Sequence, residues 1–84
     1  MKKRYAAHYL FDPRSGYQKL HGVEVEDGYV VDTFPVDEER PGTQWLPGVI
    51  RLEQAHKEWE AWHLYPFDFI SMQPADGTRR RRLL

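Results

Sequence analysis

The sequence predicts a mainly β domain: a small antiparallel sheet of about five strands, curled or sandwich-like, with one short helix near 52–62. Segments of alternating or aromatic-rich residues are separated by turn-forming Asp-Gly and Pro-Gly pairs. Three Trp, five Tyr and four Phe among 84 residues supply enough large rings to fill one small core. No linker or repeat divides the chain, so we expect a single domain over residues 1–84.

The first three strands follow from local composition. Aromatic and apolar residues predict a strand over Tyr5–Phe11. A hairpin is predicted next, with strands near 18–26 and 29–36. Its turn is Asp27-Gly28, because glycine tolerates the positive φ that a two-residue hairpin turn requires.

The segment near 52–62 has two interpretations. Leu52, Ala55, Trp59 and Trp62 recur at spacings of three, four and three, which places them on one face of a helix. No capping residue precedes the segment, however, and tryptophan is equally common in strands. We therefore predict a helix and keep a strand as the alternative.

The remainder of the chain is predicted to be loops and an edge strand. Residues 37–42 form a polar loop, and residues 73–77 have the composition of a turn. The last segment, 78–84, could pair back as a strand whose four consecutive arginines point alternately to both faces. Charges of this kind suit an edge strand, where they discourage aggregation.

The order of these features resembles a known family. Two strands joined by an Asp-Gly turn, then a polar gap, lead to Leu46-Pro47-Gly48-Val49-Ile50. Over residues 5–50 this is similar to the N-terminal composite β-sandwich of metal-dependent amidohydrolases, which continues through a Leu-Pro-Gly passage into a catalytic barrel. The resemblance implies a supporting β domain without the barrel.

The same resemblance implies that the family's chemistry is absent. In the family, an Asp or Asn and two metal-binding His follow the passage at alternate positions. Arg51, Glu53 and Ala55 occupy these places here. Alanine cannot ligate a metal, and one glutamate alone does not hold a divalent ion firmly.

Other kinds of catalytic site are not indicated either. The chain has no cysteine, which excludes disulfides and thiolate chemistry. None of His8, His21, His56 and His63 stands at the spacing that pairs two metal ligands on one strand or helix face. The carboxylates and hydroxyls show no catalytic grouping. We expect no enzymatic activity, no metal and no cofactor.

Charge and hydropathy limit the partners. The net charge of −1 combines basic ends with an acidic stretch between Glu24 and Glu39, which does not suit a general nucleic-acid binder. No run approaches the roughly 20 apolar residues that cross a membrane, and the start does not have the pattern of a signal peptide. We expect a cytoplasmic protein.

The composition therefore favours a non-catalytic interaction or accessory module. Trp and Tyr are common anchors of protein interfaces, and a domain of this size seldom buries three Trp completely. The anchor is predicted to involve Trp45, Trp59 and Trp62, with a protein partner or a second copy of the chain. The alternative is binding of nucleic acid or an acidic partner through the terminal arginines Arg79, Arg80, Arg81 and Arg82.

Overall fold

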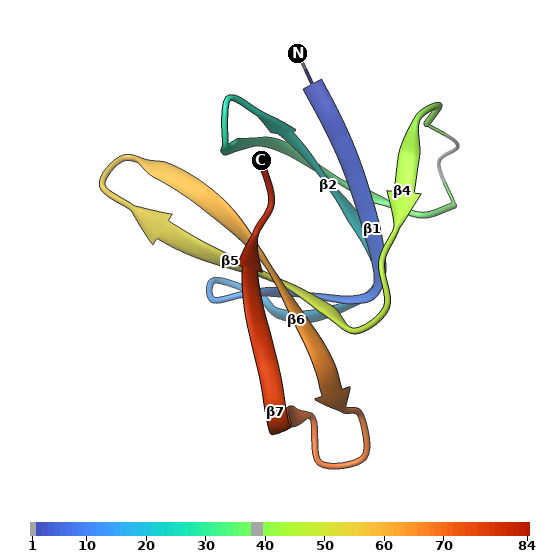
Figure 1. Ribbon diagram of the computed structural model, residues 1–84. Helices are drawn as coiled ribbons and strands as arrows, with labels where there is room; N and C mark the ends of the chain where they lie inside the picture. Colours follow the sequence, from blue (N-terminus) through green and yellow to red (C-terminus); the bar gives the residue numbers. More distant parts are fainter. Residues whose placement is uncertain (1, 38–39) are drawn as a thin grey trace.

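The computed structural model describes residues 2–37 and 40–84, which form one open mixed sheet of seven strands (Figure 1). The strands are β1 (Lys2–Asp12), β2 (Gly16–Glu26), β3 (Tyr29–Pro35), β4 (Thr43–Trp45), β5 (Val49–Ala55), β6 (Glu58–Asp68) and β7 (Gln73–Arg82). They lie in the order β3-β2-β1-β5-β6-β7, and β4 pairs with β1 outside this path. The prediction of a mainly β fold is confirmed.

Two finer predictions about the sheet are wrong. It has seven strands instead of about five, and it is mixed instead of antiparallel. β1 carries two parallel partners: Arg4–Ala6 pair with Thr43–Trp45 of β4, and Tyr9–Phe11 pair with Val49–Arg51 of β5. Such pairings join segments far apart in the sequence, and the periodicity of one strand does not reveal them.

The predicted helix over 52–62 is also wrong, because this segment is the hairpin of β5 and β6. Ala55 pairs with Glu58, and His56 in the turn between them has a φ of 57°. Leu52 and Ala61 are direct cross-strand partners and both are fully buried. No helix occurs in the described ranges, and therefore none that could cross a membrane.

The predicted hairpin around Asp27-Gly28 is confirmed. Asp27 and Gly28 have φ values of 55° and 84°, the left-handed conformation expected at both central positions of a two-residue turn. The flanking strands are β2 and β3. The predicted edge strand at the C-terminal end is β7, which begins earlier than expected, at Gln73. The predicted turn over 73–77 is therefore wrong, because all five residues belong to this strand.

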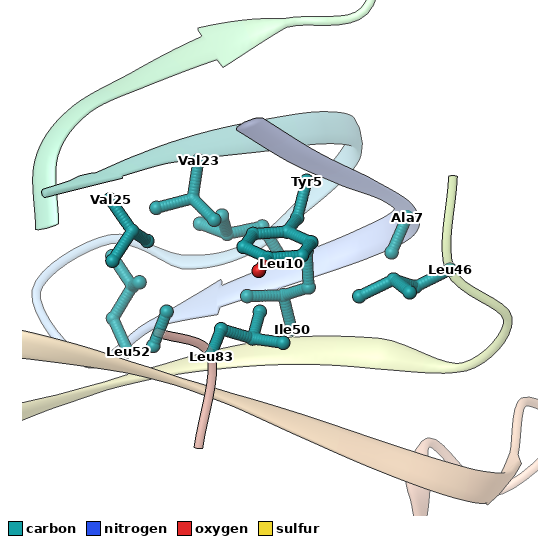
Figure 2. Packing of buried hydrophobic residues seen from close by; sticks show 10 residues of the cluster. Tyr5, Ala7, Leu10, Val23, Val25, Leu46, Ile50, Leu52 and Leu83 are labelled. Carbon is teal, nitrogen blue, oxygen red and sulfur yellow. The ribbon is translucent and has the colours of Figure 1, made fainter. Parts of the chain in front are cut away.

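The sheet curls over a mainly aliphatic core. Figure 2 shows Leu10 and Val23 from one part of the sheet meeting Ile50 and Leu52 from another. The buried cluster comprises Tyr5, Ala7, Leu10, Val23, Val25, Leu46, Ile50, Leu52, Ala61 and Leu83. Tyr5 is the only one of the twelve Trp, Tyr and Phe residues in this cluster, so the rings that the sequence assigned to the core are mostly elsewhere.

The β5–β6 turn provides a test of the hairpin that replaces the predicted helix. His56→Gly should stabilise the protein by roughly 0.5–1 kcal/mol, because a left-handed backbone costs a non-glycine residue about 1–2 kcal/mol, and the greater chain entropy of glycine offsets part of that gain. Lys57→Gly, at a neighbouring position without positive φ, should lower stability by about 0.5–1 kcal/mol. Urea unfolding measures both. Destabilisation of equal size in the two variants would contradict the hairpin turn.

Candidate functional site

Seven rings collect on the face of the sheet opposite the aliphatic core. Along β1, Leu10 points into that core, whereas Tyr9 and Phe11 pack with Val49 and Leu64 on the other side. This follows from the two-residue period of a strand. We call this set of residues the aromatic surface. It consists of seven ring-bearing residues and the loop residue Ile70. The ring-bearing residues are His8, Tyr9, Phe11, Tyr17, Trp45, Phe67 and Phe69.

The rings form one connected chain of edge and tilted contacts. The His8 and Trp45 ring centroids lie 5.1 Å apart with their planes at 79°, and His8 also approaches Phe69 at 6.4 Å. Phe69 lies 5.6 Å from Tyr9 and 5.4 Å from Phe67. These separations are in the range of favourable aromatic pairs, so the exposed rings are held against Phe67, which is buried.

Much of this surface is open to solvent. Ile70 is 99% exposed, and Trp45, Phe69 and Tyr17 are between 41% and 46% exposed. Phe69 and Ile70 lie in the loop of the β6–β7 hairpin, which projects from the rest of the sheet (Figure 1). Exposed apolar residues that adjoin one another mark interaction sites, whereas isolated ones do not.

Asp68 fixes the loop that carries Ile70. Its Oδ1 accepts hydrogen bonds from the backbone N–H of Ile70 at 2.9 Å and of Ser71 at 3.3 Å. A hydrogen bond from the Ser71 side chain, together with these backbone bonds, lowers the pKa of Asp68. The carboxylate therefore orders the loop and holds the apolar Ile70 side chain in solvent.

A buried carboxylate on β2 organises the segment that leads to Trp45. Glu24 accepts a hydrogen bond from Arg4 Nε at 2.8 Å and lies 3.7 Å from Arg40 Nη1. The hydrogen bond from Arg4, followed by the charges of Arg4 and Lys2, lowers the pKa of Glu24. Arg4 also donates to the carbonyl of Pro41, so these ions tie the residues just before β4 to the sheet.

The two other tryptophans predicted as anchors lie outside the aromatic surface. Trp59 and Trp62 are partly buried, each with a guanidinium above its ring: Arg14 is 4.2 Å from the Trp59 centroid and Arg80 is 4.4 Å from that of Trp62. Cation–π contacts of this kind stabilise the domain and cover the ring faces. Of the three predicted tryptophans, the structure places only Trp45 in the aromatic surface.

The four arginines of β7 divide between the two faces of the strand. Arg80 forms an ion pair with Glu53, and Arg82 lies 3.3 Å from Glu60 and donates to the carbonyl of Gly28. Arg79 and Arg81 point the other way and are exposed. The four consecutive arginines are thus two pairs on opposite faces of β7, and within the described residues only the pair Arg80 and Arg82 forms ion pairs.

The histidines have separate surroundings. His8 belongs to the aromatic surface, His21 contacts the Lys19 carbonyl and His56 is in a turn. His63 contacts the carbonyl of Pro47. Within residues 2–37 and 40–84, no three His, Asp or Glu side chains are grouped as metal ligands would be.

The Leu-Pro-Gly passage has a structural reason of its own. A Cβ at Gly48 would lie 2.2 Å from the Leu64 carbonyl oxygen, and Gly48 has a φ of 90°. Only glycine allows β5 to begin so close to β6. Beyond the passage, Arg51 lies over Phe11, Glu53 pairs with Arg80, and Ala55 ends β5.

Comparisons of the chain with models of protein families, with curated proteins and with solved structures found no match. The resemblance to the amidohydrolase composite domain therefore stays a prediction. The function has to be inferred from the surfaces described above.

Sequence reasoning missed most of the aromatic surface. His8 and Tyr17 lie on the consecutive strands β1 and β2, whereas Trp45 and Phe69 come from distant segments that only the tertiary structure brings to them. One local signal was available: Phe69-Ile70 lies between a strand and a turn, where polar residues are the usual choice.

Glu24 should make stability depend on pH. Because its folded pKa is below the usual 4.5, its stabilisation is present above about pH 4.5 and is lost as the pH falls through the folded pKa. The difference in urea midpoint between the native protein and Glu24→Gln should therefore be largest near neutrality and shrink in acid. Glu58→Gln, at the exposed first position of β6, is the control. A Glu24→Gln difference that stays constant with pH would contradict this role.

Asp68 should control the order of the exposed loop. Asp68→Ala removes the acceptor for two backbone N–H groups, so the heteronuclear NOE of Ile70 should fall while that of the strands is unchanged. Asp76→Ala, an exposed carboxylate on the same hairpin, serves as the matched control and should leave the loop as it is. Equal NOE values for Ile70 in all three proteins would refute the assignment.

Proposed function

We propose that this domain is a non-catalytic interaction module that binds a protein partner through the aromatic surface. The observation that carries the proposal is the exposure of Ile70 and its chain neighbour Phe69, together with that of Trp45, which His8 connects to Phe69 through ring contacts. Interface centres are rich in aromatic and aliphatic side chains and poor in charged ones. The aromatic surface has this composition, since it consists of seven rings and one isoleucine and includes no carboxylate, lysine or arginine.

Preorganisation supports the same proposal. Ordering a loop or a large side chain on binding reduces affinity. Here Asp68 already fixes the loop of Ile70, and contacts with His8 already orient Trp45. A partner that covers these residues gains apolar burial at a small entropic cost, which is the behaviour of interface hot spots.

An accessory role also fits the predicted kinship with the composite β-sandwich of amidohydrolases. In that setting such a domain supports a larger protein and contributes no ligands to the reaction. The aromatic surface would then be the side that contacts the larger body. We propose this setting as one form of the interaction, and the experiment below does not depend on it.

A photo-crosslinking amino acid at position 70 tests the proposal in the cell that makes the protein. Position 31 is the matched control, since Val31 is also an exposed β-branched residue, on β3 and outside the aromatic surface. We expect a defined heterologous product from position 70 only. The cross-linked protein is then purified and its affinity for this domain measured directly.

The affinity measurement gives the decisive numbers. Trp45→Ala should weaken binding of that partner about 30-fold, the factor equivalent to a hot spot of about 2 kcal/mol. Val31→Ser should change it by less than about twofold, as is usual for residues outside an interface. Equal cross-linking from both positions, or an unchanged affinity in Trp45→Ala, would overturn the proposal. A product of two copies of this chain would reject a heterologous partner.

A further inference from the structure

β7 is an open edge of the sheet and it is well anchored. It pairs with β6 on one side, and no strand in the described residues pairs with its other side. Beyond the strand, Leu83 is buried, its N–H donates to the Ala61 carbonyl, and Tyr5 Oη donates to the Leu84 carbonyl at 3.0 Å. The edge therefore presents its free backbone groups on an ordered strand.

The arginines on this edge carry an uncompensated charge on one face only. Arg80 and Arg82 are paired with Glu53 and Glu60. On the other face, Arg79 and Arg81 have neither an ion pair nor a side-chain hydrogen bond within the described part of the chain. The Cα atoms of Arg79 and Arg81 are two residues apart along a strand, which corresponds to roughly 7 Å. This spacing equals the distance between alternate side chains of a neighbouring strand, so each guanidinium could face one of them.

A groove accompanies the two free arginines. It has a volume of about 430 Å³ and is lined by Leu46, Pro47, His63, Tyr65, Arg79, Arg80 and Arg81, of which Arg80 is paired with Glu53. Tyr65 is 51% exposed, opposite Arg79 in the strand pairing. The site beside the edge therefore combines an apolar floor with two cations.

We infer that β7 binds an extended acidic segment of another protein, which adds as a further strand to the sheet and places acidic side chains at alternate positions beside Arg79 and Arg81. Backbone hydrogen bonds to the open edge would supply affinity, and the alternating charges would supply selectivity. Acidic residues at the intervening positions of the peptide would lie on the face of Arg80 and Arg82. They would add less binding energy there, because Glu53 and Glu60 already neutralise these two arginines. This binding site is separate from the aromatic surface.

Charge also decides against two other occupants. A second copy that paired antiparallel with the arginine run of β7 in register would place arginines opposite arginines, which is unfavourable for directly opposed residues in a sheet. A nucleic acid gains affinity by contacting many cations, and here only two of the four arginines are free. The matching edge, the charge spacing and the apolar groove favour a peptide.

Fluorescence polarisation with labelled peptides tests the inference. A peptide that alternates Glu with Thr should bind at low ionic strength. A peptide of the same composition with clustered Glu should bind more weakly, and one N-methylated at alternate amides should not bind. In NMR spectra, the outward amides of β7 should become protected from exchange with the alternating peptide only.

Variants separate this site from the rest of the protein. Arg79→Glu/Arg81→Glu should weaken the alternating peptide roughly tenfold or more, since two attractive pairs become repulsive. Arg79→Gln/Arg81→Gln is a milder variant with an effect in the same direction. Lys19→Glu/Lys57→Glu makes the same change of net charge at exposed positions elsewhere and should leave binding within about twofold. Ile70→Ser should have no effect, so this inference can fail or succeed independently of the aromatic surface.

Three results would overturn the inference. The first is equal binding of the N-methylated peptide, which would exclude strand addition. The second is equal loss of binding in the Lys19→Glu/Lys57→Glu control, which would indicate only net charge. The third is tighter binding of oligothymidylate than of the alternating peptide, with the same dependence on Arg79 and Arg81, which would assign the edge to nucleic acid.

Discussion

The division of one edge of β1 between two parallel partners is the constraint on which the rest of the structure depends. β4 pairs with residues 4–6 of β1, and β5 pairs with residues 9–11. Between them, Leu46 enters the core and Gly48 permits the close approach to β6. This change of partner lets a single sheet curl over itself, so Leu10 and Val23 come to face Ile50 and Leu52 (Figure 2).

Curling one sheet gives it an enclosed face and an outer face. The enclosed face is occupied mainly by aliphatic residues and alanine, with Tyr5 as its one buried aromatic residue. Seven other rings, those of the aromatic surface, lie on the outer face, where this short chain has no helix or second layer to cover them within its described residues. The aromatic surface is in this sense a consequence of the fold, and its exposure is what makes it available to a partner.

Local features were predicted well from the sequence, and long-range ones were not. Asp27-Gly28 specifies its hairpin through two adjacent residues that accept positive φ, so no distant information is needed. Leu52, Ala55, Trp59 and Trp62 have helical spacing, yet a turn at His56 makes them strand residues on different faces. The parallel pairs of β1 depend on tertiary packing, and a periodicity analysis does not detect them.

The candidate sites divide in the same way. The sequence identified Trp45 and the arginines of β7 as candidates by residue type alone. The sequence predicted that the four arginines alternate between two faces. It could not show which pair is engaged, because the partners Glu53 and Glu60 come from other strands. It also could not show that His8 meets both Trp45 and Phe69, since three segments of the chain supply these rings.

The central claim is that the rings lie outside the curled sheet and the aliphatic residues inside it. Solution NMR of the native protein tests this most directly through NOE contacts of the Trp45 indole. Contacts with the His8 ring, together with strong solvent relaxation enhancement at the Ile70 methyl groups, are the expected result. Contacts of the Trp45 indole with Leu10 or Ile50 would mean that the rings form the core and that the aromatic surface does not exist.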